Sequence, residues 1–250
     1  MSGHSKWAGI KHHKMAQDNK RGKMFTRLIR EITISAREGG GNIDNNSRLR
    51  KAIELAREAN MPQDNIKKSI QRGTGELPGL VYEETSYDGY GPGGVAVMVH
   101  VTSDNKNRTT AEIRRMFSQH NGNMGETGCV SWVFKQSGYI TVDKKKYEED
   151  KLMSLALDAG ADDLKTEDDN IYEIITSPAN CEKVKEELKK QNIEIIDADV
   201  TMIPSTYIKL EGKEAEQMVA LMNELEEHDD VSNVYANFDI PDELMQKISA

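Results

Sequence analysis

The sequence contains few cysteines. Only Cys129 and Cys181 occur, which is too few for a disulfide framework or a Cys-rich zinc module. We therefore expect both to be reduced and structural. Metal binding is not expected either, because His4, His12 and His13 have no cysteine or carboxylate among them to complete a tetrahedral site.

Long apolar runs are also absent. No stretch approaches the ~18 to 20 residues that span a bilayer, and charged residues make up 30% of the chain. The N-terminus lacks the apolar segment of a signal peptide, and Ser2 stands where a myristoylation signal needs a glycine. These absences predict a cytoplasmic protein with no membrane partner.

Catalytic signatures are missing as well. We find no Ser/His/Asp order, Cys/His pairing, HExxH motif or paired carboxylates. The segment 91–94, Gly-Pro-Gly-Gly, lacks the Gly-Lys-Ser/Thr ending of a phosphate-binding P-loop and is more typical of a tight loop between strands. The sequence therefore predicts a protein that is not an enzyme, with no cofactor and no evident small-molecule substrate.

Charge is distributed very unevenly. Residues 1–75 hold 16 Lys and Arg against 7 Asp and Glu, a net charge of +9, whereas residues 76–250 hold 17 against 35, a net charge of −18. A basic segment on an acidic body favours contact with a polyanion through the first part alone.

The basic segment is predicted to be a helical domain, residues 1–75, that starts with a mobile arm of about 20 residues. Apolar residues then recur at three- and four-residue spacing on one helical face, from Phe25 to Ile32. Helices are expected from about residue 18 to the glycines at 39–41, from Asn46 or Ser47 to about 59, and from Pro62 to Gly73. Residues 73–80 have the composition of a linker.

The acidic body is predicted to form two α+β domains. Residues 138–203 read as strand, helix, strand, strand, helix, strand (βαββαβ), which is the ferredoxin-like order. Residues 81–134, which end in an expected strand at 130–134, supply too few strands for a sheet of their own. We therefore expect residues 76–137 and 204–250 to form one domain, with 138–203 inserted in it. The alternative is that 171–238, which reads the same way, forms the ferredoxin-like unit.

Nucleic acid is the partner that the basic segment favours. Lys and Arg gain affinity for phosphates by releasing counterions, and Trp7 can stack on an exposed base. A second anion site is expected at residues 104–109, where backbone amides and Arg108 meet at a helix start; a capping turn is the alternative there. The predicted nucleic-acid-binding residues are Lys6, Trp7, Lys11, His12, His13, Lys14, Lys20, Arg21, Lys23, Arg27, Arg30, Asn105, Asn107, Arg108 and Thr109.

Several motifs resemble the YebC family, and the resemblance covers nearly the whole chain. They are Gly-His-Ser-Lys-Trp at 3–7, Asn-Met-Pro at 60–62, Tyr-Asp-Gly-Tyr-Gly-Pro-Gly-Gly at 87–94 and Asp-Asn-Lys-Asn-Arg-Thr at 104–109. The resemblance implies an N-terminal three-helix domain followed by two α+β domains, the third inserted in the second.

The resemblance also implies a role in gene expression. The family includes bacterial proteins labelled transcriptional regulators, a mitochondrial translational activator of a cytochrome oxidase subunit, and bacterial members that help ribosomes through proline-rich stalls. A translation factor bound to RNA or the ribosome is our main expectation, because the arm suits irregular RNA and no DNA-reading helix is recognisable. A DNA-binding transcriptional regulator is the alternative.

Overall fold

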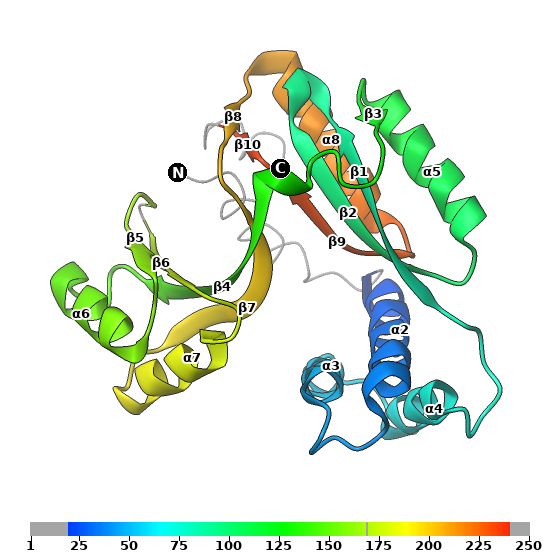
Figure 1. Cartoon of the computed structure of the whole chain (residues 1–250), viewed down its shortest axis with the longest axis horizontal. Coiled ribbons are helices and arrows are strands. Elements are labelled where there is room, and N and C mark those ends of the chain that lie inside the picture. Colours follow the sequence, from blue (N-terminus) through cyan, green and yellow to red (C-terminus); the bar gives the residue numbers. More distant parts are fainter. Residues whose placement is uncertain (1–19, 169, 241–250) are drawn as a thin grey trace.

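The computed structural model describes residues 20–168 and 170–240. This part of the chain forms three regions: a helical region, a sheet with two helices, and a second sheet with two helices (Figure 1). No helix in these residues is long and apolar enough to cross a membrane.

The helical region consists of α2 (Lys20–Gly39), α3 (Ser47–Glu58) and α4 (Gln63–Thr74). α2 packs against both other helices, and Ile32, Leu49, Ile53 and Ile66 form the buried centre of their shared core. The side chain of Asn46 caps α3 by accepting a hydrogen bond from the backbone N–H of Leu49 at 3.0 Å. The apolar spacing in the sequence therefore predicted this core correctly.

The expected end of α4 at Gly73 is wrong. Gly73 lies inside the helix, which ends at Thr74 and is capped by Gly75 with a φ of 83°. A Cβ atom at residue 73 would lie 2.3 Å from the backbone oxygen of Thr33 in α2, so this glycine permits the close approach of the two helices. The linker was predicted at residues 73–80. In the structure the irregular chain runs from 75 to 82, so it begins two residues later than predicted.

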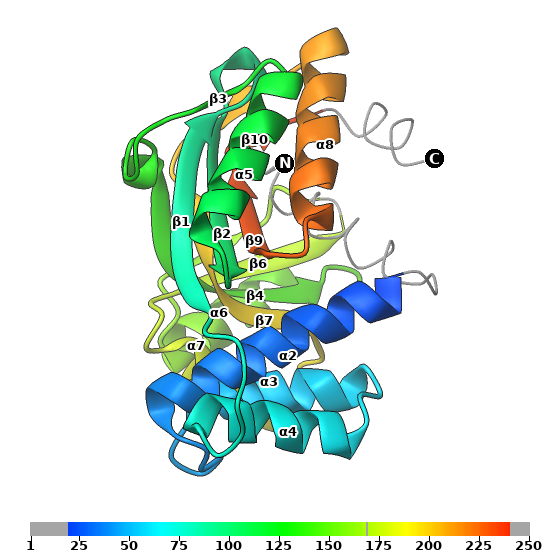
Figure 2. The same cartoon turned by 90° about the vertical axis from the view of Figure 1, so that its right-hand side faces the viewer.

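The second region is built on β1 (Glu83–Tyr90) and β2 (Ala96–Ser103), which pair antiparallel. The 3-10 turn η1 (Pro92–Gly94) joins them, as the glycine-rich composition predicted. α5 (Lys106–Gln119), β3 (Asn123–Met124), α8 (Gly212–Glu227) and β9 (Val231–Ala236) complete the region. The strand order is β3-β1-β2-β9, and α5 and α8 lie side by side on one face of the sheet (Figure 2).

This region also contains two short strands, and a turn with a 3-10 helix where a strand was expected. β8 (Ile208–Lys209) and β10 (Phe238–Asp239) form a separate parallel pair. The expected strand at 130–134 is wrong: residues 127–130 form a turn and η2 (Ser131–Val133) is a 3-10 helix. The buried carboxylate of Asp88 accepts a hydrogen bond from the N–H of Gly128 at 2.6 Å and fixes this turn.

The third region has the predicted ferredoxin-like order. It comprises β4 (Phe134–Asp143), α6 (Glu149–Ala159), β5 (Asp163–Lys165), β6 (Ile171–Thr176), α7 (Cys181–Lys190) and β7 (Ile195–Pro204). The strands form an antiparallel sheet in the order β5-β6-β4-β7, and its core with α6 and α7 is separate from the others.

The third region is inserted in the second. β9, which follows the insertion, pairs with β2, which precedes it. Because β9 does not join the sheet of β6, the alternative ferredoxin-like unit at 171–238 is excluded and the predicted fold class is confirmed. The boundaries 1–75, 76–137 with 204–250, and 138–203 stay predictions, and β4 runs across the one at 137/138.

Candidate nucleic-acid interface

The predicted contact residues of the arm lie outside the described part of the chain. They are Lys6, Trp7, Lys11, His12, His13 and Lys14. Lys20 and Arg21 begin α2, but their side chains also lie outside what the structure describes. Nucleic-acid binding by these eight residues therefore stays a prediction.

Three predicted contact residues on α2 point toward the end of α8. Lys23, Arg27 and Arg30 follow the i, i+4, i+7 spacing of one helical face. The Nζ of Lys23 donates to the backbone oxygen of Glu227 at 3.1 Å. Arg27 donates to the backbone oxygens of residues 226 and 228, the latter at 3.2 Å. The last carbonyls of a helix have no partner within it and attract cations, so these contacts complete the C-terminus of α8.

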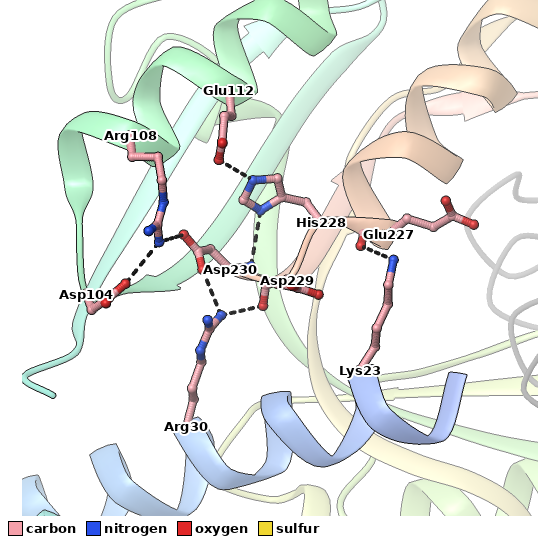
Figure 3. Close-up of a pocket in the computed structure, with 9 residues that line it drawn as sticks. All are labelled: Lys23, Arg30, Asp104, Arg108, Glu112, Glu227, His228, Asp229 and Asp230. Carbon is pink, nitrogen blue, oxygen red and sulfur yellow. Dashed lines mark hydrogen bonds and ion pairs between the residues drawn. The ribbon is translucent and has the colours of Figure 1, made fainter. Parts of the chain in front are cut away.

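Arg30 forms an ion pair with Asp230, just beyond the end of α8 (Figure 3). Its Nη1 lies 2.8 Å from Oδ1 of Asp230, and the two side chains are only 12% and 3% exposed. Arg30 also donates to the backbone oxygen of Asp229 and lies over the ring of Tyr82, 5.5 Å from its centroid. Arg30 is therefore held by the second region instead of facing solvent.

Asp230 is also bound by groups of its own region. The hydroxyls of Thr109 and Ser103 donate to its Oδ2 at 2.6 and 2.9 Å, and Nη2 of Arg108 lies 3.3 Å away. Burial alone would raise the pKa of Asp230, but the hydroxyl hydrogen bonds, the charge of Arg30 and the bond from Arg108 together hold this pKa below its usual value. Asp230 is therefore ionised and links α2 to the start of α5.

Burial has a cost for Arg27. Removal from water lowers the pKa of its guanidinium, and the nearby charges of Glu226 and Asp229 only partly offset this effect. The buried Nε atoms of Arg27 and Arg30 have no hydrogen-bond partner among the described residues. Both guanidinium groups therefore retain donors that these contacts leave unused.

The loop at 104–109 is largely a capping turn, which was the alternative to the expected anion site. The side chain of Asn105 accepts a hydrogen bond from the N–H of Arg108 at 3.1 Å and caps α5. Thr109 is fully buried against Asp230. Asn107 is exposed and borders a shallow cavity of about 380 Å³. Asn105 and Thr109 thus have structural roles, while Arg108, whose side chain is 48% exposed, also bonds Asp104 at 3.0 Å.

A larger cleft of about 470 Å³ lies between α2, the start of α5 and the end of α8. In Figure 3, Asp104 and Asp230 contact Arg108, Asp230 also contacts Arg30, and His228 bonds Glu112 at 2.8 Å. The lining residues are Lys23, Arg30, Asp104, Arg108, Glu112, Glu227, His228, Asp229 and Asp230. This excess of carboxylates opposes phosphate binding in the cleft as it stands. Among the described residues, no cluster of His, Cys, Asp and Glu is arranged to hold a metal ion.

Two cations of α3 also contact other regions. Arg48 bonds Glu31 of α2 at 2.7 Å and reaches Glu84 of β1. Its pKa is raised, mainly by the hydrogen bond with Glu31. Lys51 forms an ion pair with Asp199 of β7. The helical region therefore has polar contacts with both sheets.

A set of solvent-facing cations on α4 was not among the predicted site residues. Lys67, Lys68 and Arg72 are exposed, and they form no hydrogen bond or ion pair with the described parts of the chain. They lie opposite Ile66, which packs into the core. The signal was present in the sequence, because the apolar spacing of α4 leaves these three residues on its outer face.

Comparison with known proteins gives matches along nearly the whole chain. Residues 5–76 match the TACO1/YebC protein N-terminal domain, and residues 82–238 match the TACO1/YebC second and third domain. A relative from Endomicrobium trichonymphae is 59% identical and one from Dictyoglomus turgidum is 56% identical, with 100% of each chain covered. Both are named probable transcriptional regulatory protein.

A solved structure supports the same architecture. The crystal structure of a conserved hypothetical protein from Aquifex aeolicus has a TM-score of 0.78 and 46% sequence identity to this chain. The match covers 90% of this chain and 92% of that one. The similarity therefore extends over the helical region and both sheets.

Proposed function

The chain belongs to the TACO1/YebC family, and we propose that it is a non-enzymatic, nucleic-acid-binding regulator of gene expression that acts in the cytoplasm. Its N-terminal helical region and arm contact the polyanion, and the acidic remainder faces away from it. The uneven charge supports this arrangement, because +9 on residues 1–75 attracts phosphate and −18 on residues 76–250 repels it.

The outer face of α4 is the observation that carries the proposal. Lys67, Lys68 and Arg72 are exposed and unpaired among the described residues, whereas Arg27 and Arg30 are bound to α8. Cations that already have protein partners must exchange them to bind phosphate. Unpaired cations gain counterion release at no such cost. The α4 face is therefore the part of the described surface best suited to the first contact.

Regulation of transcription through DNA is the more specific function that the names of the relatives support. In this case, the cations of α4 bind phosphates of duplex DNA and position the protein without reading bases themselves. Discrete genomic sites are then expected, together with altered transcription of the neighbouring genes when the protein is deleted.

Binding to RNA or the ribosome is a second candidate, favoured by the composition of the arm. Trp7 stands among lysines and histidines, a mixture that suits unpaired bases and irregular RNA more than a regular groove. The loop at 104–109 would supply the second contact of this candidate. The acidic lining around Arg108 makes that second contact weaker than the sequence alone predicted.

Crosslinking in cells, followed by sequencing of the attached nucleic acid, tests the function. The α4 variant carries Lys67→Gln, Lys68→Gln and Arg72→Gln. The matched α7 control carries Lys183→Gln, Lys189→Gln and Lys190→Gln, which removes the same charge from the inserted region. We expect the wild type and the α7 control to recover nucleic acid and the α4 variant to lose most of it.

The recovered sequences identify the target. Enrichment at promoters supports the DNA function, and enrichment of ribosomal RNA or messenger RNA under translation supports the RNA function. Equal recovery by all three proteins, or recovery by none, would contradict the proposal.

A further inference from the structure

The cations that join α2 to α8 are bound to oxygens that the phosphates of a nucleic-acid backbone can replace. Lys23, Arg27 and Arg30 occupy one helical face, and their partners are the backbone oxygens at 226–229 and the carboxylate of Asp230. We call this set of contacts the α2–α8 latch. Its acceptors are oxygens that carry partial or full negative charge, the same chemistry that a row of phosphates presents.

The latch leaves the arginines incompletely satisfied. Within residues 20–168 and 170–240, the buried Nε atoms of Arg27 and Arg30 have no hydrogen-bond partner. A phosphate group binds a guanidinium through two parallel N–H donors, including Nε. Exchange of the α8 oxygens for phosphate therefore offers these residues hydrogen bonds that the latch does not provide.

Outside the latch, Ile34 of α2 is a buried apolar residue on the same helical face, and the polar contacts that join the helical region to the body are exposed. The hydrophobic core of α2–α4 contains no residue from either sheet in the described chain. The pairs Arg48–Glu84 and Lys51–Asp199 are exposed on both sides, and such pairs contribute only about 0.2 to 1 kcal/mol each. Interfaces within a chain commonly open. The Arg30–Asp230 pair is more deeply buried than the other two ion pairs, so the latch is the strongest of these polar restraints.

We propose that the α2–α8 latch is an autoinhibitory contact: nucleic-acid phosphates displace the end of α8 and Asp230 from Lys23, Arg27 and Arg30, and the helical region separates from the body. This inference rests on the proposed function. It assigns the six cations to two steps, in which the α4 face binds first and the residues of the latch bind after release. A ligand that does not displace the acidic end of α8 then binds only through the α4 face, and it binds weakly.

The latch makes a quantitative prediction for affinity. If only the open form binds through all six cations, the apparent dissociation constant equals the intrinsic constant divided by the open fraction. Removing other contacts that hold the closed form, without touching the latch or its cations, therefore raises the open fraction and the affinity. Raising the open fraction from about one tenth to about one half gives roughly a fivefold gain.

The test uses full-length protein with a fluorophore pair at Glu58→Cys on α3 and Glu216→Cys on α8, two exposed positions. Cys129 and Cys181 are replaced by alanine in every labelled protein, because Cys129 is only partly buried. The opening variant carries Glu84→Gln and Asp199→Asn, which removes the outlying ion pairs. Its control carries Glu182→Gln and Glu194→Gln, which removes the same charge within the inserted region.

Energy transfer and the affinity for oligo(dT) and oligo(U) are measured on each protein. We expect either oligonucleotide to lower transfer in the wild type, and the opening variant to show lower transfer and several-fold tighter binding than its control. If an oligonucleotide binds with unchanged transfer, or the opening variant binds no more tightly than its control, the latch is not autoinhibitory. If the wild type binds neither oligonucleotide, the proposed function itself fails, whatever the transfer shows.

Discussion

The guanidinium of Arg30 lies 2.8 Å from the carboxylate of Asp230, and this ion pair joins the first described helix to the loop after the last helix of the body. Both side chains are nearly buried, and Asp230 has three further partners in Ser103, Arg108 and Thr109. The pair therefore determines where the helical region lies on the body.

Loss of Asp230 is expected to cost more stability than loss of Arg30. Asp230→Ala leaves Arg30 without its carboxylate and leaves two buried hydroxyls without their acceptor, which predicts a loss of about 3 to 5 kcal/mol. Arg30→Ala leaves Asp230 with its remaining partners and predicts about 1 to 3 kcal/mol. Urea unfolding of the two variants measures the difference. Equal losses would show that the hydroxyl and Arg108 contacts contribute little.

Acid should weaken the latch only well below neutral pH. The pKa of Asp230 in the folded protein lies below its ordinary value of 3.8, so the ionised form is favoured by folding. Its stabilising contribution is complete above about pH 4 and is lost as the pH falls through the folded pKa. The groups that face Asp230 are the guanidinium groups of Arg30 and Arg108, the hydroxyls of Ser103 and Thr109, and Nδ1 of His228, which accepts a hydrogen bond from the backbone N–H of Asp230 at 3.1 Å.

Energy transfer between the α3 and α8 labels, followed from pH 7 downward, checks this expectation. Asp230→Asn is the control, and it should lack the acid transition. An opening transition near pH 6 in the wild type that persists in Asp230→Asn would assign the effect to another group.

Gly73 and Gly22 provide a matched pair of substitutions to alanine. A Cβ atom at Gly73 would lie 2.3 Å from the backbone oxygen of Thr33, while one at Gly22 would meet no atom of the described residues within 4 Å. Gly73→Ala should therefore force α4 from α2 and cost about 1 to 3 kcal/mol. Gly22→Ala should stabilise α2 by up to about 1 kcal/mol. Thermal unfolding distinguishes the two, and a neutral Gly73→Ala would disprove the close approach.

The sequence predicted the elements whose signals are local. The spacing of Ile32, Ile53 and Ile66 predicted the helical core, and the order of strands and helices from 138 to 203 predicted the ferredoxin-like region. The insertion also followed from the sequence, because residues 81–134 supplied too few strands. For the helical core and the ferredoxin-like region, the residues that stabilise each element are close in the chain. The insertion, which depends on the distant pairing of β2 with β9, followed only from the count of strands.

The features that the sequence did not predict depend on distant partners. Arg27 and Arg30 lie off the apolar face of α2 and were expected to bind nucleic acid. In the structure they bind carbonyl oxygens at the end of α8, and no sequence pattern near them in the chain indicates this contact. Residues 130–134 have the composition of a strand, yet Asp88 holds the preceding turn and η2 forms instead. Glycine is typical of a helix end, which is why α4 was expected to end at Gly73. Its role is instead to allow the close approach of α4 to Thr33 of α2.

The salt dependence of oligonucleotide binding tests the central claim most directly. The logarithm of affinity is plotted against the logarithm of salt concentration for the wild type, the α4 variant and the α7 control. Each lost phosphate contact should reduce the slope by about 0.9 on duplex DNA or about 0.7 on a single strand. We predict a reduction of about 2 to 3 for the α4 variant and an unchanged slope for the α7 control. An α4 variant with the slope of the wild type would contradict binding through the N-terminal helical region.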